Sequence, residues 1–233
     1  LGQVKVADKS NEITAIPKLL NLLDVSGCIV TIDAMGTQKE IAKQIIDQDA
    51  DYVLSLKGNQ GNLHRDVEQL FDWAYKTGFN EIEHEAYQTI GKGHGRIEIR
   101  RYWLLGHVEY LEDAPLWKGL KRVGMVEAER RVDGQPTTTE RRYFLTSLDG
   151  GVERFAKATR HHWGIENKLH WSLDVVFHED YSRIRHGHAP ENMTVMRKIA
   201  LNLLAKESSK GSKKAKRLKA GWDNDFLVQV LCT

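Results

Sequence analysis

Two acidic residues that lie far apart in the chain have the types and settings needed for metal-dependent chemistry. Asp33 ends an apolar run of strand length over residues 28–33, and Glu166 lies in a helical segment that also carries histidines and tryptophans. Acidic groups brought together in this way bind the divalent ions of two-metal phosphoryl-transfer sites. The structural alternatives are an Asp33 that only caps the following helix and a Glu166 held by local pairing.

The residues one helical turn either side of Glu166 are His162 and His170. A spacing of i, i+4 and i+8 would place the three side chains on one helix face, where they could bind zinc. We favour the alternative in which the histidines contact a phosphate group or hold Glu166 in place. The apolar residues of this helix that are predicted to face the core are Ile165, Leu169 and Leu173.

The first third of the chain alternates between strand and helix patterns. Strands are predicted over residues 1–6, 28–33 and 52–56, and helices over 13–23, 39–49 and 63–75. This order predicts a parallel sheet with crossover helices, in which residues 28–33 are buried on both faces. Ligand sites in such sheets lie at the carboxyl ends of the strands, the position of both Asp33 and Lys57. Thr37 and Glu40 predict a capping box for the second helix.

Residues 82–148 change to alternating apolar and polar positions, which predicts antiparallel strands. Asp133 and Gly134 between two of these segments are a hairpin signal. We interpret the region as an antiparallel β insertion in an α/β core. Further helices are predicted from residue 152 through Glu166, over 192–206 with Val195, Ile199, Leu203 and Leu204 as its apolar stripe, and over 222–231.

The composition is that of a globular protein rather than a membrane protein or a disulfide-rich one. The chain has 233 residues, of which 41% are hydrophobic and 28% charged, and it has two cysteines. No apolar run approaches the roughly 18 residues of a membrane span. Two isolated thiols fit a reducing compartment. We therefore predict a cytoplasmic protein without a membrane partner.

Positive charge is concentrated toward the end of the chain. Residues 183–219 contain 11 Lys or Arg and 2 Glu, a formal charge of +9, whereas the whole chain has +2, which leaves −7 for the remainder. This asymmetry favours nucleic acid as a partner, and the alternative is a solvated tail. Arg96, Glu98 and Arg100 share one face of a predicted strand, which either faces solvent or contacts a DNA backbone.

Several motifs resemble those of one group of transposases. They are Thr31-Ile32-Asp33-Ala34-Met35-Gly36, Lys57-Gly58-Asn59-Gln60, His94-Gly95-Arg96-Ile97-Glu98, His162-Trp163-Gly164-Ile165-Glu166-Asn167-Lys168-Leu169-His170-Trp171 and Ala189-Pro190-Glu191-Asn192. Through them, essentially the whole chain resembles the DDE-type insertion-sequence transposases of the H-repeat-associated group. The resemblance implies a ribonuclease-H-like α/β fold, a mixed sheet flanked by helices, with an antiparallel β insertion between the second and third acids.

The resemblance also implies roles for individual residues. Asp33 would be the second catalytic acid and Glu166 the third, both as ligands of Mg²⁺ or Mn²⁺, and the first Asp is expected on a strand upstream of Leu1. The residues expected to bind DNA phosphates are Lys57, Arg160, His162, Lys168, His170, Arg183 and Arg185. Related enzymes carry a Tyr and an Arg before the last acid where this chain has Thr159 and His162, and Arg160 is the candidate to replace that Arg.

The catalytic domain is expected over residues 1–205, with the insertion at 82–148, followed by a basic segment over 206–233. The implied activity is Mg²⁺-dependent DNA cleavage and strand transfer during transposition of an insertion sequence. The implied partners are the transposon ends, the target DNA and a second copy in the synaptic complex, on the bacterial nucleoid. With the first acid expected upstream, we predict that this chain alone is inactive. The alternatives are a non-catalytic DNA-binding remnant of a transposase and a zinc-dependent hydrolase or zinc-stabilised domain.

Overall fold

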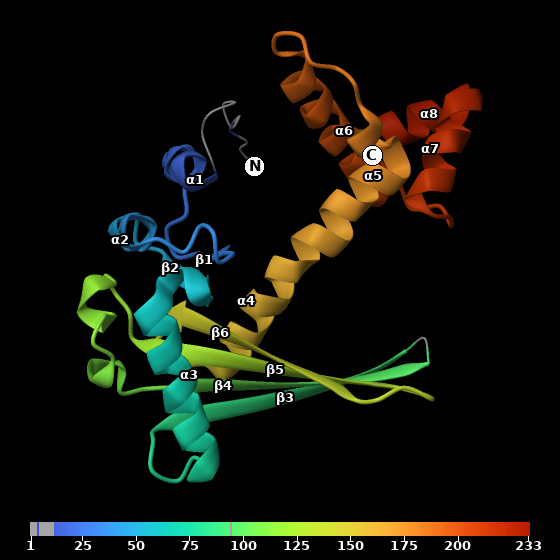
Figure 1. Cartoon of the computed structure of the whole chain (residues 1–233). Coiled ribbons are helices and arrows are strands. Elements are labelled where there is room, and N and C mark those ends of the chain that lie inside the picture. Colours follow the sequence, from blue (N-terminus) through green and yellow to red (C-terminus); the bar gives the residue numbers. More distant parts are fainter. Residues whose placement is uncertain (1–3, 5–11, 94) are drawn as a thin grey trace. The chain divides into compact units, whose positions relative to one another are not determined.

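The computed structural model contains a six-stranded mixed sheet, shown in Figure 1, and describes residues 4, 12–93 and 95–233, without the side chains of 166–168. The strand order is β1-β2-β6-β5-β4-β3. The strands are β1 (Ile29–Ile32), β2 (Asp51–Leu56), β3 (His84–Gly93), β4 (Arg96–Leu105), β5 (Arg122–Val132) and β6 (Thr138–Thr146). The strand predicted at residues 1–6 lies outside the described residues, apart from residue 4.

The parallel part of the sheet is formed by β1 and β2, which pair in register from Ile29 opposite Asp51. Helix α2 (Lys39–Asp47) connects them, so the predicted crossover unit is confirmed. The prediction that residues 28–33 are buried on both faces is wrong, since every residue of β1 is only half-buried. The reason is that β1 forms one edge of the described sheet, where its neighbours cover it from one side.

The antiparallel strands β3 to β6 continue the same sheet rather than forming a separate layer. The hairpin signal is confirmed, because β5 and β6 pair on either side of the turn and Gly134 has a φ of 71°. Glycine adopts this left-handed backbone at no steric cost, because it has no Cβ. As Figure 1 shows, the four strands run well beyond the part of the sheet that α3 covers.

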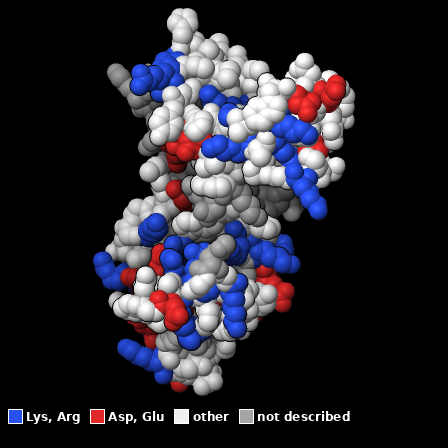
Figure 2. All heavy atoms as spheres, turned by 90° about the vertical axis from the view of Figure 1, so that its right-hand side faces the viewer, with Lys and Arg blue, Asp and Glu red and all other residues white. Residues whose placement is uncertain are grey.

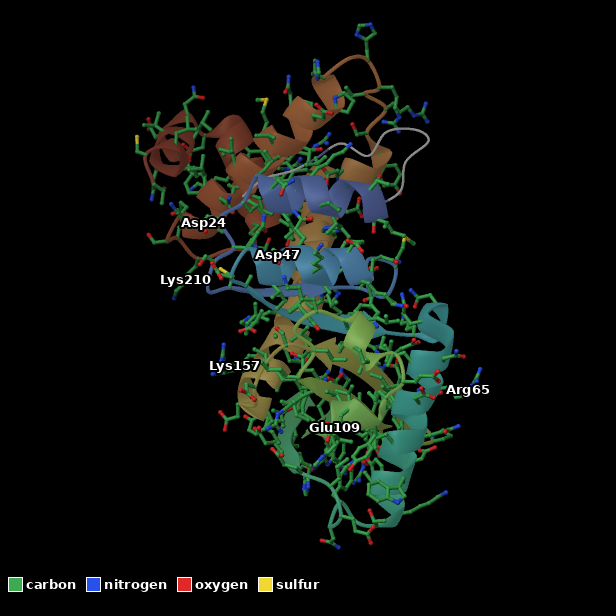
Figure 3. The ribbon with its side chains drawn as sticks, turned by 90° about the vertical axis from the view of Figure 1, so that its left-hand side faces the viewer. Asp24, Asp47, Arg65, Glu109, Lys157 and Lys210 are labelled. Carbon is green, nitrogen blue, oxygen red and sulfur yellow. The ribbon has the colours of Figure 1, made fainter. Side chains whose placement is uncertain are left out.

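Helices cover both faces of this sheet. On one face, α1 (Glu12–Asn21), α2 and α3 (Gly61–Lys76) pack over a core that includes Leu54 and Leu145. On the other face, α4 (Val152–Gly164) packs Phe155 and Ala156 against Val53 and its neighbours. In Figure 3, Arg65 on α3 and Lys157 on α4 accordingly lie on opposite sides of the sheet. The sheet is therefore sandwiched between helix layers.

By its contacts the chain divides into two compact units, Leu1–His162 and Trp163–Thr233. The second unit is helical, with α5 (Trp171–Phe177), α6 (Ala189–Lys206), α7 (Lys213–Trp222) and α8 (Asn224–Leu231). Segment 206–233 therefore contains two helices, of which the sequence predicted only the second. The domain boundary predicted after residue 205 stays a prediction. The core of this unit consists of Leu173, Val176, Leu201, Leu204, Phe226 and Val230.

A π turn, η4 (Ile165–His170), separates α4 from α5. A π turn holds more residues than an α turn, so it shifts the angular positions of the side chains that follow. The prediction of one buried stripe through Ile165, Leu169 and Leu173 is wrong for this reason, because Ile165 is 50% exposed whereas Leu173 is buried. In α6 the predicted stripe is confirmed for Leu203 and Leu204, which pack in the core of this unit, and wrong for Val195 and Ile199, which are exposed. Leu201, which was not predicted, is also buried.

Short 3₁₀ turns complete the described structure: η1 (Gly58–Gln60), η2 (Val108–Tyr110), η3 (Ala114–Leu116) and η5 (Glu179–Tyr181). Within the described residues, no helix combines the length and the apolar character that crossing a membrane requires.

Candidate active site

Asp33 follows directly after β1, and its side chain is exposed. Its Oδ1 accepts a hydrogen bond of 3.2 Å from the backbone N–H of Gly36, and no ion pair to Asp33 occurs among the described residues. In β1, Ile29 packs toward the α4 side of the sheet, and Val30 and Ile32 pack toward the α3 side. The alternation of a strand therefore assigns Asp33 to the α4 side, together with Thr31.

The side chain of Thr37 is fully buried and does not cap α2, contrary to the prediction. The residue at the N-cap is Gln38, which makes no side-chain capping bond. The Thr37 hydroxyl instead lies 2.7 Å from the carbonyl oxygen of Ser55 on β2 and 3.0 Å from that of Asp33. The capping signal was misleading because the Thr37 hydroxyl donates to two backbone carbonyl oxygens of the folded core and does not accept a bond from the N-terminal amides of α2.

The turn that contains Lys57 lies against the Asp33 loop. Asn59 donates a hydrogen bond of 2.6 Å to the carbonyl oxygen of Ala34, and Gln60 donates one of 2.8 Å to that of Thr37. These bonds join the loops at the carboxyl ends of the two parallel strands, and Asp33 and Lys57 follow directly after β1 and β2 as predicted. Lys57 itself is exposed, and no described contact tests its phosphate-binding role.

His162 lies in the last turn of α4, and Arg160 lies just before that turn, both within the first unit. The Nδ1 atom of His162 is 3.2 Å from the hydroxyl of Thr31, so this histidine holds α4 against β1. Arg160 is exposed and lies close to Glu98 on β4. Burial raises the pKa of Glu98, but Arg100, Arg96 and Arg160 outweigh it and lower the pKa overall.

The other predicted site residues belong to the second unit. The backbone of Glu166 and Lys168 lies in the π turn, and their side chains are outside the described residues. His170 lines a cavity of about 540 Å³ with Asp174, Glu179 and Lys198 among its walls, which the sequence reasoning missed. Exposed arginines lie in the segment between α5 and α6: Arg183, and Arg185, whose guanidinium donates to the carbonyl oxygens of Ser182 and Ile184.

The donor chemistry of Asp33 fits a hard divalent cation. A carboxylate oxygen is a preferred ligand of Mg²⁺, which commonly binds one or two carboxylates and keeps several waters. Among the residues that the structure describes, no group of three His, Cys, Asp or Glu side chains is close enough to bind a metal. Of the predicted pair Asp33 and Glu166, only the side chain of Asp33 is described. The zinc alternative through His162, Glu166 and His170 stays open, although His162 Nδ1 already contacts Thr31.

A second feature of the first unit is a basic face on the outer part of the antiparallel strands. The register aligns Glu98 with Arg130 and Thr138, and Arg100 with Thr89, Ala128 and Glu140. These rows share the face of Tyr102 and Val126, which pack toward α4. We call this surface the α4-side strand face; its charged residues are Arg96, Glu98, Arg100, Arg130, Glu140 and Arg142.

Arginine exceeds glutamate on the α4-side strand face. Glu98 pairs with Arg96 at 3.1 Å and also with Arg100, and Glu140 pairs with Arg142 at 2.8 Å. Figure 2 shows Lys and Arg gathered over the outer ends of these strands, with fewer acidic side chains between them. The surplus positive charge makes this face suitable for a polyanion.

On the opposite face of the same strands, Arg101 and Arg141 are paired around Glu127. Glu127 is buried and accepts bonds from Arg101 at 3.0 Å, Arg141 at 2.9 Å and the Tyr75 hydroxyl at 3.0 Å. Burial and the Glu127 carboxylate raise the pKa of Tyr75. Sequence reasoning missed this network, because the register that aligns Arg101 with Glu127 depends on strand pairing.

Comparison with known proteins identifies the chain's relatives. A family model described as "Transposase DDE domain" matches residues 1–203. The chain belongs to the DDE transposase domain family. The ribonuclease-H-like α/β fold and the resemblance to H-repeat-associated transposases are confirmed.

The similar proteins include several from Escherichia coli. The chain is 42% identical over 239 residues to "H repeat-associated putative transposase YhhI" of strain K12, and 43% identical over 239 residues to "Putative protein YbfL" of the same strain. In each case 99% of this chain and 62% of the relative are aligned. "Putative transposase YncI" of strain O157:H7 is 43% identical over 238 residues. The DDE transposase chain thus spans about three fifths of the length of these relatives.

Proposed function

We propose that the full-length protein cleaves the DNA ends of an insertion sequence and transfers them to target DNA, with Asp33 and Glu166 as metal-binding catalytic acids. Membership of the DDE transposase family supports DNA cutting and joining as the kind of reaction. The observation that carries the residue assignment is the exposed Asp33 carboxylate at the carboxyl end of β1, where ligand sites of such sheets lie.

The contact between His162 and Thr31 supports the pairing of Asp33 with Glu166. Asp33 follows Thr31 by two residues, and Glu166 follows His162 by four. The π turn over Ile165–His170 gives further support, because π turns in helices occur frequently at functional sites.

Mg²⁺ or Mn²⁺ would supply Lewis acidity and a lowered pKa of bound water when held by these acids. The chain's own cations would bind and orient DNA phosphates through charge-assisted hydrogen bonds. In this proposal the phosphate-binding residues are Lys57, Arg160, His162, Lys168, His170, Arg183 and Arg185. The α4-side strand face would extend phosphate binding along the duplex, and its surplus arginines support DNA as the partner.

The proposal is tested by cleavage of end-labelled element DNA by the full-length protein in Mg²⁺, with Asp33→Asn and Glu166→Gln as variants. Asp24→Asn is the matched control, because Asp24 is also exposed and its Oδ1 also accepts a backbone N–H, that of Ser26 at 3.3 Å. Asp24 precedes β1, and Figure 3 labels it. We expect both site variants to lose cleavage by more than a hundredfold and the control to keep it.

DNA binding is measured on the same proteins by fluorescence anisotropy. We expect the site variants to bind element DNA nearly as well as the wild type. Cleavage that persists in Asp33→Asn or Glu166→Gln would contradict the assignment. A wild-type protein that binds DNA but never cuts it in Mg²⁺ or Mn²⁺ would favour the alternative, a DNA-binding remnant without catalysis.

A further inference from the structure

The loop that carries Asp33 is held by one buried side chain, Thr37. This hydroxyl is inaccessible to solvent and has two carbonyl oxygens within reach, that of Ser55 at 2.7 Å and that of Asp33 at 3.0 Å. A hydroxyl has one proton to donate, so it is shared between the two acceptors. The bond ties the backbone of Asp33 to the neighbouring strand β2.

The loop makes further hydrogen bonds of its own. Gly36 donates its backbone N–H to the Asp33 carboxylate, and the backbone N–H of Thr37 donates to the carbonyl oxygen of Ala34 at 3.4 Å. The Asn59 amide reaches the same carbonyl, but Asn59 is exposed and its bond competes with water. Gln60, which donates to the Thr37 carbonyl oxygen, is half-buried. Of these three side chains Thr37 is thus the one that is fully buried, and buried bonds of this kind are costly to leave unmade.

We propose that Thr37 is a positioning residue for Asp33, which fixes the direction of the carboxylate by holding the Asp33 carbonyl against β2. The inference rests on the function proposed above. Residues that orient a metal ligand without touching the metal alter metal affinity by about 10–100-fold when they are replaced. Thr37 would act through backbone position alone, since its hydroxyl contacts the peptide of Asp33 rather than its side chain.

The chain offers a matched control in Thr146. This residue is also fully buried, and its hydroxyl donates 2.8 Å to the carbonyl oxygen of Tyr52, near the other end of β2. Thr37→Val and Thr146→Val each remove one buried hydroxyl that binds a β2 carbonyl, with little change of volume. Effects that reflect stability alone appear in both variants.

The test is Mn²⁺ binding to the full-length protein, measured from the electron paramagnetic resonance signal of the free ion. We expect Thr37→Val to raise the Kd for Mn²⁺ about tenfold or more, Thr37→Ser to restore it, and Thr146→Val to leave it unchanged. A wild-type Kd in Thr37→Val, or an equal increase in Thr146→Val, would overturn the proposal.

Two further measurements separate this inference from the proposed function. If Asp33→Ala binds Mn²⁺ as well as the wild type does, Asp33 is not a metal ligand, and the metal assignment fails. Hydrogen exchange at the Gly36 amide then still reports on Thr37, because that N–H is held by the Asp33 carboxylate. We expect faster exchange in Thr37→Val than in Thr146→Val, and equal rates would contradict the role of Thr37 in holding Asp33.

Discussion

The imidazole Nδ1 of His162 lies 3.2 Å from the hydroxyl of Thr31, a contact between residues 131 positions apart in the chain. It attaches the last turn of α4 in the first unit to the edge strand β1. Thr31 lies two residues before the candidate acid Asp33, and His162 lies four residues before the candidate acid Glu166. The contact therefore fixes the end of α4 against the strand that leads to Asp33.

This contact predicts energetic coupling between His162 and Thr31. In a double-mutant cycle of His162→Ala and Thr31→Val, we expect a coupling free energy of about 0.5–1.5 kcal/mol, the usual net contribution of one hydrogen bond. Hydrogen exchange of the β1 amides measures the free energy of opening in the first unit. If the free-energy losses of the two single variants add up to that of the double variant within about 0.3 kcal/mol, the two side chains do not interact.

Arg130 on the α4-side strand face is predicted to contact DNA phosphate. Each phosphate contact contributes about 0.9 to the slope of log K against log salt concentration, so Arg130→Ala should reduce the slope by about 1. The control is Arg131→Ala, because the next residue lies on the opposite face and pairs with Glu129. Salt titrations of DNA binding provide the measurement. The prediction is refuted if both variants change the slope equally.

Gly36 is predicted to be intolerant of any side chain. A Cβ at this position would lie 2.4 Å from Cγ2 of Ile32 and 2.6 Å from Cδ1 of Ile16. Forcing an extra methyl group into such a packed site costs about 1–3 kcal/mol, so Gly36→Ala should lower the free energy of unfolding by that amount. Gly58→Ala is the control, because nothing lies within 4 Å of its Cβ position. Urea denaturation of both variants would decide, and equal stabilities would rule out the crowding at Gly36.

Glu207 is predicted to make the second unit sensitive to acid. Hydrogen bonds from Ser209 and Lys216 lower the pKa of this buried carboxyl to about 2. An unfolded Glu has a pKa of about 4.3, so its stabilising contribution is complete above that pH and is lost as the pH falls toward 2. We expect Glu207→Gln to be less stable than the wild type at neutral pH. Between about pH 4 and pH 2, the range set by the two pKa values, the variant should lose less stability than the wild type.

Thermal unfolding followed by circular dichroism across this pH range measures the effect. The comparison variant is Glu191→Gln, which changes an acid near the start of α6 in the same unit. Parallel acid profiles for the wild type and Glu207→Gln would contradict the link between the Glu207 pKa and the stability of α6, α7 and α8.

Local pattern in the sequence was sufficient for most of the elements that position Asp33. The apolar run before Asp33, the alternating segments and the Asp133-Gly134 turn predicted β1, the strands β4, β5 and β6 and the β5–β6 hairpin, whereas no strand was located at β3. These features depend on backbone preferences and burial periods of neighbouring residues, which are properties of short segments. The motif order also indicated the transposase family, which the family match confirms.

Tertiary structure alone decided which groups bond across the fold. Thr37 looked like a helix cap, and its hydroxyl binds Ser55, 18 residues away. The π turn over Ile165–His170 changed which side chains face the core, whereas the sequence pattern predicted one continuous α-helix. The alignment of Arg101 with Glu127 followed from strand register. Such contacts depend on where distant segments pack, and the periodicity of a single segment carries no information about its partner's position.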